Sequence, residues 1–484
     1  MPASVTAARP PTSPGWADRP EAPGAALMWA GGVDTRTGKG DNTAMQRHES
    51  IPRREFLRRS RDWSLGTAAL ALAPNLFLNQ TRAQTGENPS ELIRVGIIGT
   101  GGQGRANMMA RSLVKHVVAV CDVDKSHAAE AARQLKERTG VEAKVFYDYR
   151  KLLEDRSIDA VLLGTPDHWH ALPAIHACMA GKDVYVEKPL SLTIEEGQVM
   201  VQAARYYKRI VQTGSQQRSW PDEKFRRAAE YVRSERIGEI RTVRVGLPGV
   251  NYLDRAKPPR VPDSAPPPEL DYDMWLGPAP YRPYNKNRVH YLFRFFWDYS
   301  GGQMTNWGAH HLDITQWALN MDQSGPVEIS GRAEFNKEGL YETPEWFEVT
   351  YRYANGVRVI CGNSHRIGTT FEGQDGILYV DRGRLECTVK GVLEEPLRAD
   401  EVHLEVSKDH HQNWLEAIKS RKPPICDVAI GHRSATVCHL GNIAILTGRT
   451  IRWDPAREQF EGEPVMAKQY RYEYRKPWEL PKIG

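Results

Sequence analysis

Cysteine pairs and long apolar runs are scarce in this sequence, and each scarcity excludes a class of protein. The chain has 484 residues but only six cysteines, and none of them forms a Cys-x-x-Cys pair. We therefore expect neither a zinc ribbon nor a thioredoxin-type redox centre. The one apolar run that approaches membrane length, near residues 63–78, is too short to span comfortably, so no stable membrane anchor is expected.

Excess charge is also scarce outside the N-terminal segment. The net charge is +5, but residues 1–85 carry 11 Lys and Arg against 7 Asp and Glu, whereas the remainder carries 54 against 53. A nucleic-acid-binding surface needs clustered positive charge, so no nucleic-acid partner is expected. The length and the 40% hydrophobic content suffice for two or three domains with a sizeable core.

The N-terminal segment has the features of an export signal. Arg53 and Arg54 precede a weakly apolar stretch, and together they resemble a twin-arginine signal within a leader that covers residues 1–85. An amphipathic basic helix is the alternative. Met45 lies eight residues before Arg53 and is a second candidate start of the chain. We expect a folded protein that is exported to the periplasm.

A dinucleotide-binding pattern opens the next domain, which we assign to residues 86–213. An apolar run at residues 93–98 is typical of a buried parallel strand, and a G-x-G-x-x-G motif at residues 99–104 follows it directly. A helix is expected near 105–113 and a second strand at 116–121. These glycines allow a tight turn and a close approach of the backbone to pyrophosphate at the helix N-terminus.

An acidic residue completes the pattern. Asp122 ends the second predicted strand, 18 residues after Gly104, where a carboxylate can bind both ribose hydroxyls and repel a 2′-phosphate. NAD is therefore expected as the cofactor in preference to NADP. Strands and helices then alternate, which predicts a doubly wound parallel sheet. The further strands are expected near 144–147, 160–164, 184–186 and 210–213, with helices at 168–180 and 194–207.

Three later motifs give the chain a family resemblance. They are Thr165-Pro166 with a following histidine, Glu187-Lys188-Pro189, and Asn306-x-Gly308-x-His310. Together with the glycine motif, they resemble the Gfo/Idh/MocA oxidoreductases over about residues 92–450. The resemblance implies an α/β protein with an N-terminal Rossmann domain and a C-terminal α/β domain with an open, mostly antiparallel sheet. It also implies oxidation or reduction of a sugar or cyclitol carbon, and we expect a homo-oligomer, a dimer or tetramer.

The C-terminal half, residues 214–484, agrees with this expectation. A Pro-rich insertion at 255–290 cannot hold a regular helix or central strand, and it is either a surface arm or a mobile loop. Asn355-Gly356 is a strong hairpin signal. Strands are expected at 241–247, 327–335, 347–353, 357–361, 378–380 and 384–388, and helices at 409–420 and 432–447.

The expected chemistry centres on Lys188 and His310. Oxidising a secondary alcohol needs a base, and a lysine can serve if burial or a neighbouring cation lowers its pKa. Lys188 follows a predicted strand end, where ligands gather in open α/β sheets. His310 stands at the family's catalytic histidine position and Asn306 at its aspartate position. Four residues separate them, so they are expected on one helix face, where Asn306 keeps a hydrogen bond but lacks the charge. Either Lys188 or His310 can be the main base.

The resemblance assigns further residues to cofactor and substrate. The predicted cofactor-binding residues are Gly99, Gly101, Gln103, Gly104, Asp122, Thr165, Pro166, His170, Glu187 and Lys188. The predicted substrate-contacting residues are Trp169, Arg218, Trp307 and His311, and Trp275 is expected near the cofactor. His311 and Asp313 suggest a metal site with His168, His170 or His290, but no zinc-binding spacing supports it, so no metal is expected.

Three functions remain open from the sequence. The first is an NAD-dependent sugar or polyol dehydrogenase. The second is a glycoside-cleaving enzyme in which tightly held NAD oxidises a sugar transiently, permits elimination and then reduces the product. The third is a non-catalytic sugar-binding protein, against which the intact Lys188 and His310 argue.

The leader gives a testable prediction about export. Replacing Arg53→Lys together with Arg54→Lys should retain the protein in the cytoplasm, because a twin-arginine signal requires both arginines. Fractionation of cells followed by immunoblotting measures this. Equal periplasmic yields of mutant and wild type would contradict it, and translation from Met45 should export at least as well as the full chain.

Overall fold

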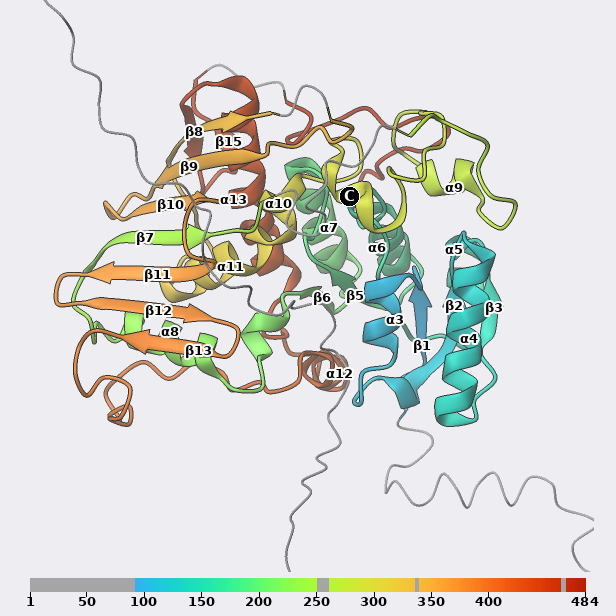
Figure 1. The fold of residues 1–484 in the computed structure, drawn as a ribbon. Coiled ribbons are helices and arrows are strands. Elements are labelled where there is room, and N and C mark those ends of the chain that lie inside the picture. The colour runs from blue at the N-terminus through green and yellow to red at the C-terminus, as the bar shows by residue number, and fades with distance from the viewer. Residues whose placement is uncertain (1–91, 250–260, 336–338, 463–466) are drawn as a thin grey trace, which may run out of the picture. The chain divides into compact units, whose positions relative to one another are not determined.

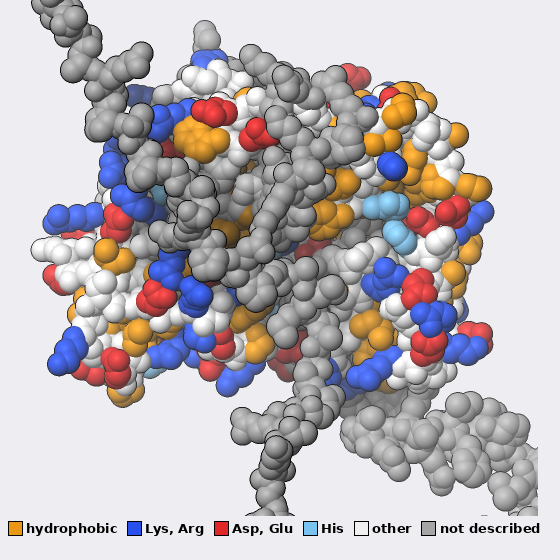
Figure 2. Space-filling view, in the orientation of Figure 1, with side chains coloured by type: hydrophobic (Ala, Val, Ile, Leu, Met, Phe, Trp, Pro, Cys, Tyr) orange, Lys and Arg blue, Asp and Glu red, His pale blue; other side chains and the backbone are white. Residues whose placement is uncertain are grey.

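The computed structural model describes residues 92–249, 261–335, 339–462 and 467–484 (Figure 1). The predicted leader, with Arg53, Arg54 and Met45, lies outside these residues, as does part of the Pro-rich insertion. Within the described part of the chain, no helix is both long and apolar enough to cross a membrane. On the face drawn in Figure 2, the lysine and arginine side chains are interspersed with acidic ones.

The N-terminal domain is built on a six-stranded parallel sheet with the order β3-β2-β1-β4-β5-β6. Both β1 and β4 are buried along their whole length, as strands covered on both faces must be. The predicted doubly wound sheet is confirmed. The strands are β1 (Val95–Ile98), β2 (Val117–Cys121), β3 (Lys144–Phe146), β4 (Ala160–Leu163), β5 (Asp183–Glu187) and β6 (Val211–Gly214).

The helices of this domain follow the predicted alternation with two local differences. The first helix begins inside the glycine motif rather than after it, and the helix expected at 168–180 is divided into a 3-10 turn and an α-helix. Pro173 is tolerated because it lies in the first turn of that α-helix. The elements are α3 (Gly102–Met108), η2 (Val114–His116), α4 (Lys125–Thr139), α5 (Tyr149–Glu154), η3 (Asp167–Trp169), α6 (Ala171–Met179) and α7 (Ile194–Tyr206).

The C-terminal domain contains a nine-stranded sheet in the order β13-β12-β11-β7-β10-β9-β8-β14-β15. Only β7 and β10 pair in parallel among these described strands, so the expected open, mostly antiparallel sheet is confirmed. The strands are β7 (Ile240–Gly246), β8 (Glu328–Glu334), β9 (Trp346–Arg352), β10 (Arg358–Gly362), β11 (Gly368–Gly373), β12 (Ile377–Asp381), β13 (Arg384–Cys387), β14 (Ile451–Asp454) and β15 (Gln459–Phe460).

The hairpin predicted at Asn355-Gly356 joins β9 to β10. Gly356 has a φ of +87°, and the Asn355 side chain accepts a hydrogen bond from the Val357 amide. Strands β11, β14 and β15 were not predicted. The sequence of β11 begins and ends with glycine and has two adjacent threonines, so it lacks the apolar alternation that marks a strand.

Helices pack against this sheet and reach toward the Rossmann domain. The long α13 contacts β8 and β9 of the sheet and also α7 and β6 of the other domain, while α11 and α8 pack together beside β7 and β12 (Figure 1). The helices and turns are η4 (Gln216–Ser219), α8 (Lys224–Arg233), α9 (Tyr272–Leu276), η6 (His290–Phe295), α10 (Gly302–Asn306), α11 (Gly308–Ala318), α12 (His410–Ser420) and α13 (Val428–Thr447).

The described part of the Pro-rich insertion, from residue 261 onward, is an arm packed on the Rossmann domain of the same chain. The prediction that it holds no regular helix is wrong, because the short helix α9 lies in the proline-free stretch between Pro268 and Pro278. The Asp271 amide donates to the Val123 carbonyl, the Lys125 amide donates to the Glu269 carbonyl, and Leu270 forms an isolated bridge with Asp124. Aromatic residues of the arm form their own buried cluster. These contacts bring the arm to the carboxyl end of β2.

The glycine motif gives a prediction about stability. A Cβ on Gly104 would lie 1.8 Å from the Gly99 carbonyl oxygen, whereas a Cβ on Gly102 would meet nothing within 4 Å. Gly104→Ala should therefore lower the free energy of unfolding by about 2–4 kcal/mol, because backbone atoms must move. Gly102→Ala is the matched control and should change it by less than about 0.5 kcal/mol. Urea titration measures both, and equal effects would contradict the close helix–strand approach.

Candidate cofactor and substrate site

A cavity of about 310 Å³ lies at the carboxyl ends of β1, β2, β4 and β5. This edge is where ligands bind in open parallel α/β sheets. On the Rossmann side, the cavity is lined by the glycine motif, by the segment after β2, and by the loops that contain Thr165 and Lys188. The arm closes the other side with residues of α9 and η6, namely Met274, Trp275, His290, Tyr291, Phe293 and Arg294.

The glycine motif and Asp122 form the nucleotide end of the cavity. Gly99 has a φ of +82°, which favours glycine, and the space a Gly104 side chain would fill is taken by backbone. The Asp122 Oδ2 accepts hydrogen bonds from the Thr100 amide at 2.7 Å and the Thr100 hydroxyl at 3.2 Å. Asp122 therefore fixes the glycine loop as well as facing the cavity, and this bare backbone cradle with its carboxylate fits a dinucleotide.

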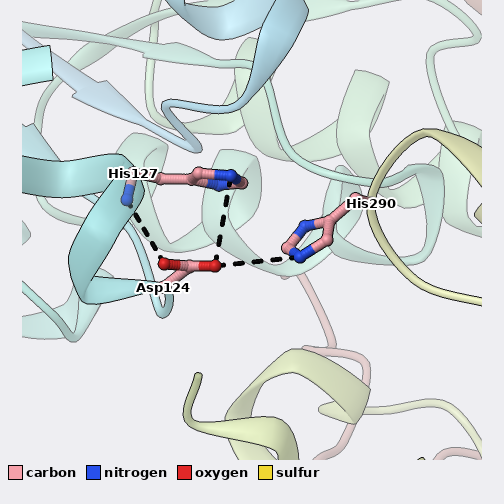
Figure 3. Close-up of side chains that lie close together, drawn as sticks. All are labelled: Asp124, His127 and His290. Atoms are coloured by element: carbon pink, nitrogen blue, oxygen red, sulfur yellow. Dashed lines mark hydrogen bonds and ion pairs between the residues drawn. The ribbon is translucent and has the colours of Figure 1, made fainter. Parts of the chain in front are cut away.

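The side chains of Asp124, His127 and His290 also line the nucleotide end of the cavity and lie close together (Figure 3). The Asp124 Oδ2 lies 3.7 Å from the His290 Nε2 and 4.0 Å from the His127 Nε2, and the two imidazole rings are 4.8 Å apart. Asp122 raises the pKa of His127 through a hydrogen bond, and burial lowers the pKa of His290. These residue types can bind a divalent cation.

His168 and His170, which the sequence suggested as metal ligands together with His290, are not part of this group. The His168 Nε2 is 2.9 Å from the Trp275 carbonyl oxygen, and burial lowers the His168 pKa to about 4. His170, predicted to bind cofactor, does not line the cavity. Its ring nitrogens lie 2.7 Å from the Pro189 carbonyl and 3.0 Å from the Thr165 carbonyl, so it holds the Thr-Pro and Glu-Lys-Pro segments together.

Glu187 is a buried carboxylate surrounded by amide donors. Its Oε1 accepts hydrogen bonds from Asn107 at 2.7 Å and from Gln216 at 2.7 Å, with Gln103 at 3.5 Å. Neither Asn107 nor Gln216 was predicted as a site residue. Asn107 lies one helical turn after Gln103 and accepts a hydrogen bond from it, which is the spacing that could have indicated this position.

The Lys188 ammonium reaches across to the C-terminal domain. Its Nζ donates to the Asn306 carbonyl at 2.9 Å and to the Asn306 Oδ1 at 3.0 Å. Burial, and then the nearby positive charge of Arg294, lower the Lys188 pKa to about 8. The Asn306 amide is oriented by a hydrogen bond to the Gln303 Oε1 at 3.1 Å. This pKa suits a group that must exchange a proton near neutral pH.

His310 lies near Lys188, although it is not among the residues that line the cavity, and it is not hydrogen-bonded to Asn306, which corrects the sequence prediction. The expected continuous helix is broken at Trp307, so α10 ends at Asn306 and α11 begins at Gly308. The Asn306 amide oxygen points to Lys188 instead. Burial, and then the charge of Lys188, place the His310 pKa well below its usual value. The imidazole is therefore neutral, and among the described residues its buried Nδ1 has no hydrogen-bond partner.

Arg218 was expected at the substrate, but the structure places it in a buried ion-pair network. Its side chain is 1% exposed and contacts Asp313 through Nε at 2.9 Å and Asp322 through Nη2 at 2.7 Å. The guanidinium also lies 5.0 Å from the Trp317 ring. The buried carboxylate of Asp313 and the partly exposed carboxylate of Asp322 offset the cost of burying this charge, so Arg218 and Asp313 stabilise the domain and do not face the cavity.

Of the three aromatic residues predicted to contact the substrate, one lines the cavity and two do not. Trp169 lines the cavity, and its indole nitrogen donates to the Trp275 carbonyl at 2.9 Å. His311 is fully buried against Trp307, with ring centres 5.8 Å apart, and does not line the cavity. Burial lowers the His311 pKa to about 3, so this ring is neutral. Trp307 is half-buried, beside His310 and Arg382.

Comparison with known families agrees with this architecture. Residues 93–215 match the oxidoreductase family domain described as an NAD-binding Rossmann fold, and residues 256–480 match the C-terminal alpha/beta domain of the same family. The chain belongs to the Gfo/Idh/MocA oxidoreductase family. Its N-terminal half is an NAD-binding Rossmann domain of that family, and NAD(H) is the cofactor.

Individual relatives have several activities. The chain is 26% identical to a myo-inositol 2-dehydrogenase of Thermotoga maritima over 369 residues, which is 74% of this chain and 94% of that protein. It is 31% identical to a glycosyl hydrolase family 109 protein of Shewanella over 170 residues, which is 32% of this chain and 37% of that protein. The chain therefore matches little more than a third of the glycosyl hydrolase's length.

Solved structures share the fold at low sequence identity. A myo-inositol dehydrogenase from Lactobacillus casei, in complex with NAD(H) and myo-inositol, superimposes with a TM-score of 0.52 at 19% identity, covering 77% of this chain and 99% of that chain. The WlbA dehydrogenase from Bordetella pertussis, in complex with NADH and UDP-GlcNAcA, gives a TM-score of 0.54 at 19% identity, covering 75% and 99%.

Asp122 gives a prediction about the cofactor. Asp122→Asn keeps an oxygen that can accept the Thr100 amide but removes the charge that would repel a 2′-phosphate. The ratio of NADP to NAD affinity should rise by about tenfold, which corresponds to about 1.4 kcal/mol. Calorimetry with both dinucleotides measures the ratio. Asp122→Ala should relax the discrimination too and also weaken NAD binding, whereas tighter NADP than NAD binding by the wild type would contradict the role assigned to Asp122.

Proposed function

We propose that this protein is an NAD(H)-dependent oxidoreductase that acts on a secondary hydroxyl of a sugar, polyol or glycoside. One observation carries the proposal. The ammonium of Lys188, with a pKa lowered to about 8, lies at the end of β5 in the cavity that begins at the glycine motif. A proton-accepting group and a dinucleotide cradle are the two parts that oxidation of an alcohol requires.

The residues that would hold the dinucleotide are distributed along the cavity. The glycine motif offers backbone to the pyrophosphate, and the N-terminus of α3 favours its charge. Asp122 offers its carboxylate to the ribose hydroxyls, while Thr165 and Pro166 line the wall toward Lys188. When bound, NAD(H) supplies the hydride acceptor or donor for the reaction.

Lys188 and His310 divide the work on the substrate hydroxyl. In the direction of oxidation, neutral Lys188 removes the hydroxyl proton, and in reduction its ammonium returns that proton. The Asn306 oxygens hold the Lys188 Nζ in place at 2.9 and 3.0 Å. Neutral His310 offers a ring nitrogen that orients the hydroxyl. Because Asn306 is uncharged, it does not hold His310 in its protonated form.

The Lys188 pKa gives a prediction about pH. Since this pKa is lowered to about 8, the neutral base is a minority form at pH 7, and the single-turnover rate of oxidation should rise with pH and level off above about pH 8. Lys188→Arg keeps the charge but cannot lose its proton, so the rise should disappear. Stopped-flow measurement of NADH formation at several pH values tests this, and an unchanged profile in Lys188→Arg would exclude Lys188 as the base.

Removing the side chain of Lys188 or of His310 should also slow hydride transfer. Lys188→Ala and His310→Ala should each reduce the single-turnover rate by about 10²–10⁴-fold, while NAD binding changes little. The double mutant should lose less than the product of the single losses, because groups that act together are non-additive. A His310→Ala rate equal to wild type would leave Lys188 as the sole acid–base group.

A second candidate function is glycoside cleavage with retained NAD. Two observations favour it: the partial match to the Shewanella glycosyl hydrolase, and the arm, which covers the nucleotide cavity with η6. Export through the predicted leader would add a reason, because free NAD is scarce outside the cytoplasm. Absorbance of NAD(H) in the purified protein after dialysis distinguishes the two, since retained cofactor supports cleavage and rapid exchange supports an ordinary dehydrogenase.

A homo-oligomer is proposed from the family resemblance.

A further inference from the structure

An aspartate and two histidines from separate segments of the chain meet at the nucleotide end of the cavity. Asp124 is the N-cap residue of α4, His127 lies in the first turn of that helix, and His290 begins η6 of the arm. One carboxylate oxygen, the Asp124 Oδ2, faces both rings (Figure 3). One ligand atom of each residue lies within 4.8 Å of the ligand atoms of the other two.

The distances within this group are longer than hydrogen bonds and close to those between two ligands of one metal ion. The Asp124 Oδ2 is 4.0 Å from the His127 Nε2 and 3.7 Å from the His290 Nε2. A hydrogen bond between nitrogen and oxygen joins atoms about 2.7–3.2 Å apart. Around a tetrahedral zinc ion, with bonds of about 2.0–2.2 Å, neighbouring ligand atoms lie about 3.3–3.6 Å apart. Small side-chain rotations would bring the three atoms to those positions.

The remaining polar atoms of the group are arranged as the supports of metal ligands usually are. The Asp124 Oδ1 accepts hydrogen bonds from the Ser126 and His127 amides at 2.9 and 3.2 Å, which fixes the carboxylate and leaves Oδ2 for the histidines. On the other side of the His127 ring, Nδ1 lies 3.8 Å from the Asp122 Oδ2. A carboxylate behind the second ring nitrogen orients a ligand histidine and raises its basicity.

The group is accessible to an ion and adjoins the glycine motif. All three residues line the cavity, and the side chains of His127 and His290 are 28% and 41% exposed. Three protein ligands leave a fourth position open for water or for an oxygen of the dinucleotide. A Cβ on Gly101 would lie 3.9 Å from the His127 ring, so the group borders the loop that would hold the pyrophosphate.

We propose that Asp124, His127 and His290 bind one divalent transition-metal ion of the zinc type, which joins the arm to the Rossmann domain beside the bound dinucleotide. Two imidazole nitrogens and one carboxylate suit Zn²⁺, whereas Mg²⁺ and Ca²⁺ prefer oxygen ligands. No metal was expected from the sequence, because His290 is distant in the chain from the other two and reaches them only through the arm. The ion acts as a structural cross-link and takes no part in hydride transfer.

Calorimetry with Zn²⁺ alone tests the site, on tag-free protein loaded with NADH and on the same protein without it. One equivalent of Zn²⁺ should bind, and an excess of Mg²⁺ should not displace it. Co²⁺ provides a second readout, because its visible absorption changes when it enters a four-coordinate site with nitrogen ligands. Neither measurement depends on catalytic activity.

Variants that preserve the local backbone identify the ligands. Asp124→Asn retains a good N-cap residue, His127→Gln is compatible with a helix, and His290→Asn tolerates the φ of +51° at that position. Each should weaken Zn²⁺ binding by about tenfold or more. His403→Gln is the matched control, because it removes an exposed imidazole whose Nε2 lies 2.9 Å from the Arg398 carbonyl oxygen, and it should leave the affinity unchanged.

The cross-link should also be coupled to the cofactor. NADH should bind about fivefold or more tightly when Zn²⁺ is present, because the ion holds the arm over the cavity. NADH should tighten Zn²⁺ binding by the same factor, since coupling between two sites is reciprocal. In His290→Asn the arm no longer contributes a ligand, so this coupling should disappear.

The absence of one bound equivalent of Zn²⁺, or an unchanged affinity in all three variants, would overturn the proposal and leave only an ion pair between protonated His127 and Asp124. Displacement of NADH by Zn²⁺ would also overturn it, because the ion would then occupy the space of the dinucleotide. Zn²⁺ binding without any change in NADH affinity would overturn the joining of arm and Rossmann domain. Each of these results leaves the proposed hydride chemistry at Lys188 intact.

Discussion

The contact between Lys188 and Asn306 joins the two domains at the site to which we assign the hydride chemistry. Lys188 ends the Rossmann part of the cavity, and its Nζ is held by two oxygens of a residue 118 positions later in the chain. Burial at this contact lowers the Lys188 pKa to about 8, so the amine can lose or gain a proton near neutral pH. Arg294 and His310 both lie near this amine: the charge of Arg294 lowers the pKa of Lys188, and the charge of Lys188 lowers the pKa of His310.

The rest of the fold supports that contact from both sides. The parallel sheet brings the glycine motif, Asp122 and Lys188 to one edge because all its strands run in the same direction. The arm returns to this edge through backbone hydrogen bonds from Asp271 to Val123 and from Lys125 to Glu269, and it places η6 over the cavity. The buried ion pairs of Arg218 fix α11, from which His310 projects, because Asp313 belongs to the same helix.

Local sequence signals predicted the cofactor half well, because its residues lie in short motifs attached directly to strands. Asp122 is an example, since its place at a strand end follows from chain order alone. Contacts between distant residues were not predictable in the same way. Arg218 was assigned to the substrate by the family resemblance, and its partner Asp322, 104 positions away, could not be predicted from chain order. The Asn306 orientation depends on a helix break at Trp307 that periodicity did not reveal. The close approach of His127 and His290 depends on how the arm folds back onto the Rossmann domain.

A structure of the protein with NAD bound would show whether Lys188 lies at the position of hydride transfer. We expect the adenosine ribose at Asp122 and the nicotinamide at the far end of the cavity. Its C4 atom should face the space between Lys188 and His310, where a substrate carbon can approach within about 3–3.5 Å. A nicotinamide that points away from Lys188, or one separated from it by the arm, would contradict the assignment of hydride chemistry to this site.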